Sequence, residues 1–165
     1  MTSADLVDFS DPPLVEVVIS VQFDRVAGLA SYRSAGLFKR WSGDYPHVTP
    51  QPEMSPLPPL AGAADGIFVH MGPAVEGRLW FGSPDEQHLI QLQADRLAYN
   101  WRDVGQPYPR YPHVRARFVR AWEDLTQVFD DGRPVVNQIE VTYVNRAAGS
   151  PDLVLAGWDN KLCAQ

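Results

Sequence analysis

The chain has 165 residues, a formal net charge of −6 and a sequence pI near 5.1, and 45% of its residues are hydrophobic. This length fits a single domain with a buried core, and this composition excludes general disorder. The negative charge disfavours binding to phosphate backbones, and the single cysteine, Cys163, excludes an intramolecular disulfide and a cysteine-ligated zinc site.

The first predicted elements are a strand and a helix. Hydrophobic and polar residues alternate over residues 15–23, which is typical of a strand with one face in the core. Asp24 is placed to cap a helix over residues 26–41. Gly28 and Gly36 weaken this prediction, since each costs about 1 kcal/mol inside a helix relative to alanine.

Residues 44–66 are predicted to form a loop. Six prolines remove backbone donors and fix φ, so neither a helix nor a central strand can run through this segment. They are Pro46, Pro50, Pro52, Pro56, Pro58 and Pro59. A loop of this length and composition is either a variable connection or a contact surface for a partner.

Three or four short strands are predicted next, over residues 67–71, 78–83, 88–93 and 96–102. The last two are joined by Ala94-Asp95, which predicts a two-residue hairpin. Its register pairs Leu92 with Leu97, Ile90 with Tyr99, and His88 with Trp101. The other face of the hairpin then carries Gln91, Gln93, Arg96, Asn100 and Arg102.

An amphipathic helix over residues 113–129 follows a proline-rich loop at residues 105–112. A strand over residues 135–146 and a short tail over residues 147–165 end the chain, which gives the order β-α-β-β-β-β-α-β. We expect one α+β domain over residues 1–146, in which an antiparallel sheet of about five to six strands has both helices packed on one face.

The N-terminus has neither the basic nor the apolar region of a signal peptide, and no run approaches the roughly 20 apolar residues of a membrane helix. We therefore expect a cytoplasmic protein without membrane contact. Five arginines lie close together in the sequence, but acidic residues lie among or beside them, so binding to nucleic acid is not expected. The arginines are Arg102, Arg110, Arg115, Arg117 and Arg120, and the acidic residues are Asp103, Glu123 and Asp124.

Three stretches of the chain form a recognisable pattern. The first covers residues 11–17 and is followed by Gln22-Phe23, and the third covers residues 139–145. The second covers residues 89–111 and contains Leu89-Ile90-Gln91-Leu92-Gln93, Tyr99-Asn100-Trp101-Arg102 and Tyr108-Pro109-Arg110-Tyr111. This pattern resembles a sporadically distributed family of uncharacterised bacterial proteins. The resemblance implies a bacterial cytoplasmic protein and brings no established activity or cofactor. Family members continue past the final strand, so the resemblance also implies a shortened C-terminal region here.

The polar residues of the predicted strands should share the face of the sheet that the helices leave uncovered. They are Glu16, Ser20, Gln22, Gln91, Gln93, Asn100, Arg102, Glu140 and Thr142. Two interpretations stay open. This face is an ordinary solvated surface, or its long amides, which both donate and accept hydrogen bonds, bind a polar ligand or a second protein surface.

Aromatic and arginine residues gather after the predicted hairpin. Trp101 is followed by Tyr108, Arg110 and Tyr111, and these residue types dominate binding hot spots. The alternative is structural, with Trp101 in the core and the tyrosines holding the loop down. Together with the polar face, this loop gives the predicted binding residues Gln91, Gln93, Asn100, Arg102, Tyr108, Arg110, Tyr111 and Glu140.

The sequence has no catalytic, metal or cofactor motif. Its four histidines lack metal-ligand spacing, His88 is expected to be a satisfied core residue, and no phosphate loop or nucleophile elbow occurs. An enzyme would have to use Glu140 as acid or base and Arg102 as anion binder. If these two side chains lie close together, they should form an ion pair.

The sequence therefore favours a non-catalytic binding or partner-protein module of a bacterial cytoplasm. Its expected partner is another protein or a second copy of the chain, with a small polar ligand as the other candidate. Two alternatives stay open: an enzyme acting on a small polar substrate at the polar face, and a self-associating structural protein.

Overall fold

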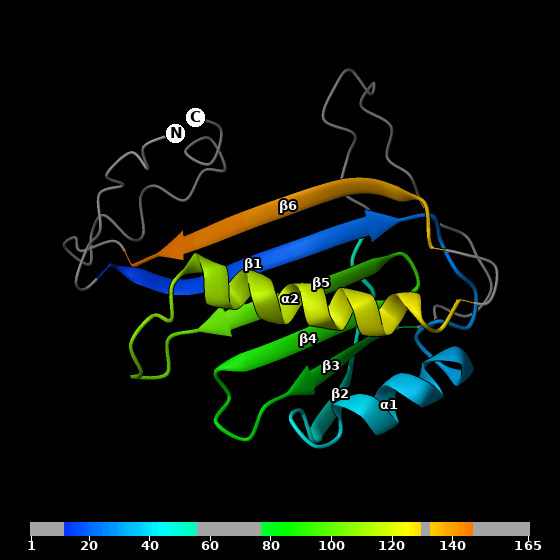
Figure 1. Ribbon diagram of the computed structural model, residues 1–165, viewed down its shortest axis with the longest axis horizontal. Coiled ribbons are helices and arrows are strands. Elements are labelled where there is room, and N and C mark those ends of the chain that lie inside the picture. Colours follow the sequence, from blue (N-terminus) through cyan, green and yellow to red (C-terminus); the bar gives the residue numbers. More distant parts are fainter. Residues whose placement is uncertain (1–11, 56–76, 130–132, 147–165) are drawn as a thin grey trace.

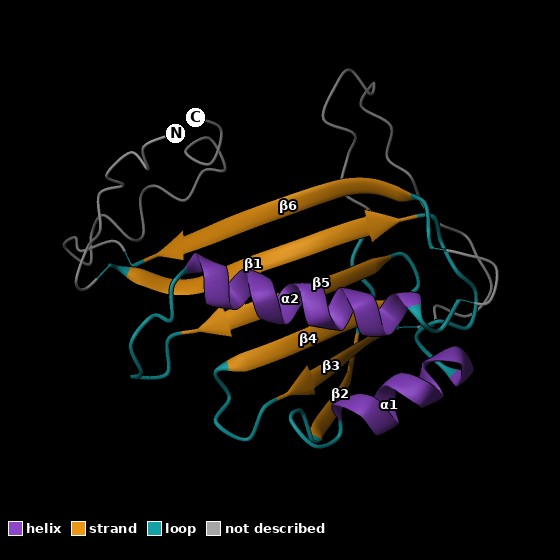
Figure 2. Cartoon of the chain, in the orientation of Figure 1, coloured by secondary structure: helices purple, strands orange, loops and turns teal. Residues whose placement is uncertain are grey.

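A computed structural model describes residues 12–55, 77–129 and 133–146 of the chain. These residues form six strands and three helices, which Figures 1 and 2 trace. The strands are β1 (Leu14–Phe23), β2 (His47–Gln51), β3 (Arg78–Gly82), β4 (His88–Gln93), β5 (Arg96–Arg102) and β6 (Val136–Asn145). The helices are the 3-10 helix η1 (Tyr32–Ser34) and the α-helices α1 (Ala35–Trp41) and α2 (Tyr111–Thr126).

The six strands form one antiparallel sheet in the order β2-β3-β4-β5-β1-β6. α2 crosses one face of this sheet over β5 and β1 (Figure 1). α1 lies on the same side, where Phe38 and Trp41 pack edge-on against Phe81 of β3. The predicted α+β class, with an antiparallel sheet and both helices on one face, is confirmed.

One row of side chains on the helix side shows how far the helices cover the sheet. It crosses all six strands in the order Val48, Phe81, Ile90, Tyr99, Ile19 and Val141. The four inner members are at most 3% exposed, whereas Val48 and Val141 at the two ends are each 39% exposed. Among the described residues, the helices therefore bury the inner strands and leave the two edge strands partly exposed.

The β4–β5 hairpin has the predicted register. Leu92 pairs with Leu97, Ile90 with Tyr99, and His88 with Trp101. The tight connection and the alternation of both strands specify this pairing locally, because a slip of one residue would move every side chain to the opposite face. α2 and β6 also lie close to their predicted positions.

The predicted helix over residues 26–41 is wrong over its first part. Gly28 adopts a left-handed conformation with φ of 77°, and the ring of Tyr32 lies where a Cβ on this glycine would be. Glycine tolerates this conformation, which a helix cannot contain. Turns therefore occupy residues 27–31, and the α-helix is confined to α1.

The predicted loop over residues 44–66 is wrong near its start, where β2 pairs with β3. β2 is an edge strand, so Pro50 needs no ladder hydrogen bond on its outer side. The prolines thus exclude a central strand, as expected, but not an edge strand. The part of this segment after residue 55, and the predicted strand over residues 67–71, lie outside the described residues.

Replacing Trp101 by alanine tests the packing of the helix side. Trp101 is 1% exposed, and the centroids of its ring and the Tyr108 ring are 4.9 Å apart. We expect Trp101→Ala to lower the free energy of unfolding by about 3–5 kcal/mol, the usual cost for a large buried aromatic side chain. Val104→Ala is the control, since Val104 lies in a loop and is 43% exposed. Urea denaturation measures both, and equal losses would contradict this account of the core.

Candidate functional site

The predicted polar residues all lie on the face of the sheet away from the helices. One row on this face crosses five strands in the order Trp80, Gln91, Ala98, Ser20 and Glu140. Opposite residues of paired strands point to the same side, so Gln91 and Glu140 share one face. We call this surface, with the other polar strand residues named in the sequence analysis, the polar face.

A chain of hydrogen bonds crosses four strands of the polar face. The Oε1 of Gln91 accepts from Arg78 Nη1 at 2.8 Å and from Trp80 Nε1 at 3.0 Å. Its Nε2 donates to Asn100 Oδ1 at 2.8 Å, and Asn100 Nδ2 donates to Glu16 Oε1 at 2.7 Å. Each oxygen and nitrogen of the two amides therefore has a partner within the sheet.

Arg102 joins this network at its far end. Its Nε donates to Glu16 Oε1 at 3.3 Å, which makes an ion pair. Its guanidinium carbon also lies 5.3 Å from the centroid of the Trp80 ring, and Arg78 lies at the same distance from that ring. The Trp80–Arg102 contact reaches across β4, because β4 lies between β3 and β5. The charge of the Arg102 guanidinium is thus paired with Glu16, and its planar face contacts Trp80.

Residues 53–55 cover another part of the polar face. The N–H of Met54 donates to Gln93 Oε1 at 3.0 Å, and Gln93 Nε2 donates to the Met54 carbonyl at 2.9 Å. Arg96 Nη2 donates to the Ser55 carbonyl at 3.1 Å. Gln93 is 1% exposed and Arg96 is 6% exposed. Gln93, predicted to bind a partner, is therefore a buried residue that holds the crossing segment.

The network predicts a stability cost for removing its central amide. Asn100 is 3% exposed, and Asn100→Ala would deprive Gln91 Nε2 of its acceptor and Glu16 Oε1 of one donor. We expect a loss of about 1–3 kcal/mol, the cost of leaving a buried polar group unsatisfied. Thr142→Ala on the same face is the control, since the Thr142 hydroxyl donates to the nearby Glu140 at 3.1 Å in a half-buried site. A thermal denaturation in which Asn100→Ala matches this control would contradict the proposed role of the network.

The expected ion pair between Glu140 and Arg102 does not form. Arg102 lies opposite Glu16, whereas Glu140 lies opposite Ser20 on the other side of β1. The Cα atoms of these two residues are separated by two strand spacings and by four residues along the strands, which together amount to roughly 16 Å. This separation is too large for a direct ion pair between them.

The predicted aromatic loop lies on the helix side of the sheet, at the start of α2. Tyr108 packs on Trp101, and burial together with the neighbouring Tyr143 raises the pKa of Tyr108 to about 12. Tyr111 begins α2, and Arg110 directly before it is half-buried with φ of 71°. The two halves of the predicted site thus lie on opposite faces of the sheet, and one small ligand cannot contact both.

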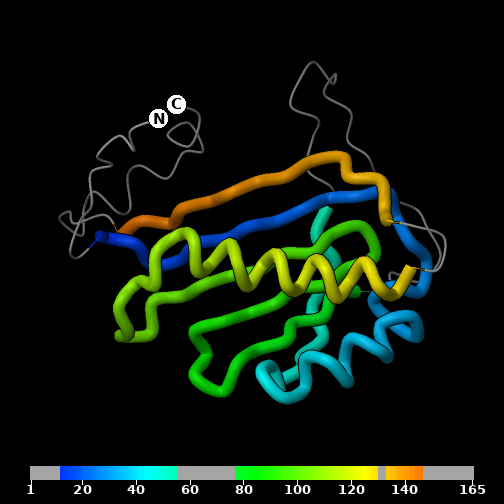
Figure 3. Tube along the Cα trace, viewed as in Figure 1, coloured from blue at the N-terminus to red at the C-terminus, as the bar shows by residue number. Residues whose placement is uncertain are grey.

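Three apolar side chains of β6 are exposed on the helix side, and we call them the β6 apolar row. Ile139 is 65% exposed, Tyr143 is 47% exposed and Val141 is 39% exposed. Ile139 pairs with Val21 of β1, Val141 with Ile19 and Tyr143 with Val17, and these three partners are at most 3% exposed. α2 covers β1 and β5, while β6 runs along the rim outside it (Figure 3). The sequence shows the alternation of β6 but not that this strand lies at an edge.

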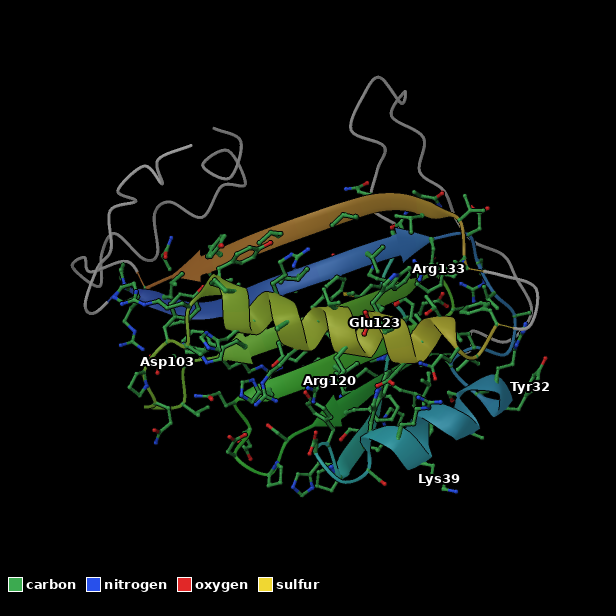
Figure 4. The ribbon with its side chains drawn as sticks, in the orientation of Figure 1. Tyr32, Lys39, Asp103, Arg120, Glu123 and Arg133 are labelled. Carbon is green, nitrogen blue, oxygen red and sulfur yellow. The ribbon has the colours of Figure 1, made fainter. Side chains whose placement is uncertain are left out.

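A cleft of about 580 Å³ opens between α2, the β3–β4 turn and the loop before β2. Its polar lining residues are Asp44, Ser83, Asp85, His88, Arg117 and Arg120, the last of which is labelled on α2 in Figure 4. The Ser83 hydroxyl donates to Asp85 and also accepts from the His88 backbone N–H. The hydrogen bonds of this serine therefore hold the turn together.

A hydrogen bond joins His88, at the wall of the cleft, to a buried tyrosine. His88 Nδ1 and Tyr99 Oη share a hydrogen bond at 2.7 Å. Tyr45 lies near both Tyr99 and Arg117 and raises the pKa of each. Burial first, and the charge of Arg117 second, lower the pKa of His88. His88 is thus a satisfied histidine, as expected, but it lies at the wall of a cleft.

The pKa of His88 gives a direct test of this arrangement. We expect Arg117→Gln to raise the pKa of His88 towards its ordinary value of 6.5, because a nearby positive charge is removed. Arg115→Gln is the control, since Arg115 is exposed on the same helix and does not line the cleft. An NMR titration of the imidazole measures both variants, and an unchanged pKa in Arg117→Gln would contradict the proximity of the two groups.

The lowered pKa of His88 also predicts how the stability of the fold depends on pH. The folded ring has the lower pKa, so the unfolded chain takes up a proton first as the pH falls. The contribution of His88 to stability is therefore complete above about pH 6.5 and is lost as the pH falls below it.

Comparisons with known proteins do not identify the chain: no family model, no curated protein and no solved structure matches it. Within the three described ranges, no group of three His, Cys, Asp or Glu side chains is placed to hold a metal ion. None of the described helices has the length and apolar character needed to cross a membrane.

Proposed function

We propose that this domain is a non-catalytic protein-interaction module whose binding site is the edge of β6 with the β6 apolar row. The observation that carries the proposal is the exposure of Ile139, Val141 and Tyr143, at 65%, 39% and 47%, on a strand at the rim of the sheet. A partner strand paired with β6 would cover these side chains and bond the backbone groups along the edge.

The composition of β6 supports this proposal. Only Glu140 among its ten residues carries a charge, and the strand contains no proline and no lysine. Edge strands that avoid pairing are usually short or carry such residues. β2, at the other edge, has five residues and contains Pro50. β2 is thus protected against strand addition, whereas β6 is suited to it.

The polar face supports a binding function less well. Its amides bond to one another and to residues 53–55, so few of their donors and acceptors are left for a partner. The enzyme alternative requires Glu140 and Arg102 at one site, and it is less well supported because Arg102 pairs with Glu16 and not with Glu140. A small polar ligand would find better enclosure in the cleft beside His88. The resemblance carried by residues 89–111 favours a bacterial cytoplasm as the setting of the module.

A charge placed in the β6 apolar row should weaken strand addition. Peptides selected from a phage-displayed library on the wild-type chain should bind Val141→Lys about tenfold more weakly or worse, because a buried ammonium costs more than 1.4 kcal/mol. Val48→Lys is the matched control, since Val48 and Val141 are both 39% exposed and end the same cross-strand row. Fluorescence anisotropy measures the three affinities.

Hydrogen exchange locates the bound peptide independently. We expect bound peptides to slow amide exchange in β6 and to leave β2 unchanged. Peptides that bind Val141→Lys as tightly as the wild-type chain, or that protect only strands away from β6, would show that β6 is not the site.

A further inference from the structure

We infer that the strand received by β6 is the β6 of a second copy of this chain. The two strands run antiparallel about a two-fold axis perpendicular to the sheet, with Val141 at the axis. This inference rests on the proposed function and names the partner.

The symmetry preserves both faces of the sheet. Opposite side chains of an antiparallel pair lie on the same side, and this axis brings together residues that already share a side. The helix side of one copy therefore continues into the helix side of the other. The β6 apolar row lies beside its own copy there, while Gln138, Glu140 and Thr142 lie along the contact on the polar face.

The length and charge of β6 select the position of the axis. A strand over Val136–Asn145 overlaps its copy most fully when the axis lies at residue 140 or 141. An axis at Glu140 would place two carboxylates directly opposite each other, which is destabilising. An axis at Val141 avoids this contact and places Glu140 opposite Thr142 of the second copy.

The register at Val141 gives complementary neighbours on both faces. On the helix side, Ile139 lies opposite Tyr143 of the second copy, and β-branched residues opposite aromatic residues are favourable cross-strand pairs. On the polar face, the Thr142 hydroxyl already donates to Glu140 Oε1 within its own strand at 3.1 Å. The carboxylate thus gains a hydroxyl group directly opposite it, and Glu140 of the second copy lies only diagonally, about 7–8 Å away.

Tyr143 connects this contact with the loop before α2. Burial and the neighbouring Tyr111 raise the pKa of Tyr143, and Tyr143 in turn raises the pKa of Tyr108. Tyr143 shares a cross-strand row with Trp101, on which Tyr108 packs, so Tyr143 belongs to one aromatic group with Tyr108 and Tyr111. Ile139 of the second copy would lie against that group. Pairing therefore covers the aromatic residues together with the β6 apolar row.

Cysteine cross-linking tests the partner and the register together. All variants carry Cys163→Ser, so the introduced thiol is the single one in the chain. Val141→Cys lies on the axis, and oxidation should convert most of this variant into a covalent dimer. Ile139→Cys alone and Tyr143→Cys alone should stay monomeric under denaturing conditions, because like positions lie about 14 Å apart. A mixture of these two variants should cross-link, since each thiol lies opposite the other.

Sedimentation of the unmodified chain completes the test. At the cross-linking concentration, the wild-type chain and Val48→Lys should be dimers and Val141→Lys a monomer. A monomeric wild-type chain, or an Ile139→Cys variant that cross-links to itself as efficiently as Val141→Cys, would overturn the inference. If the wild-type chain is monomeric and selected peptides still bind at β6, the proposed function stands and the second copy is the wrong partner.

Discussion

The structure depends on the packing of one long helix, α2, across β5 and β1. An α-helix with its side chains is about 10–12 Å wide and neighbouring strands lie about 4.8 Å apart, so one helix covers about two strands. α1 has only seven residues and adds cover near Phe81 of β3. A sheet of six strands is wider than this cover. The inner members of the cross-strand row are therefore buried, and the valines at its two ends are not.

The polar face follows from the same constraint, because no described helix covers it and its strands are joined there by side chains. An amide side chain donates and accepts at once, so a single Gln or Asn can bond to the strands on both sides of it. Gln91 reaches β3 and β5 in this way, and Asn100 reaches β4 and β1. A lysine, which only donates, could not replace either residue. The abundance of amides on this face therefore has a structural explanation that requires no ligand.

The sequence predicted those features that depend on local pattern. The register of the β4–β5 hairpin and the sidedness of Gln91 and Glu140 followed from alternation and one tight turn. The ion-pair partner of Arg102 could not be predicted in this way, because it depends on which strand lies beside β5. The loss of the first helical turns depends on the left-handed Gly28 against Tyr32, and β2 depends on pairing with a distant strand. The position of β6 at the rim depends in the same way on strand order, so its exposed row could not be recognised from alternation alone.

The difference between the two rims of the sheet favours pairing through β6. Pro50 removes one backbone donor from β2, and four of the five residues of that short strand are exposed. β6 is twice as long, has one charged residue and presents three apolar side chains, one of which, Tyr143, lies near Tyr108. Joining two copies through β6 would leave a β2 strand at each outer edge of the combined sheet. Both unprotected edges would then be covered, and the combined sheet would end only in edges that resist further strand addition.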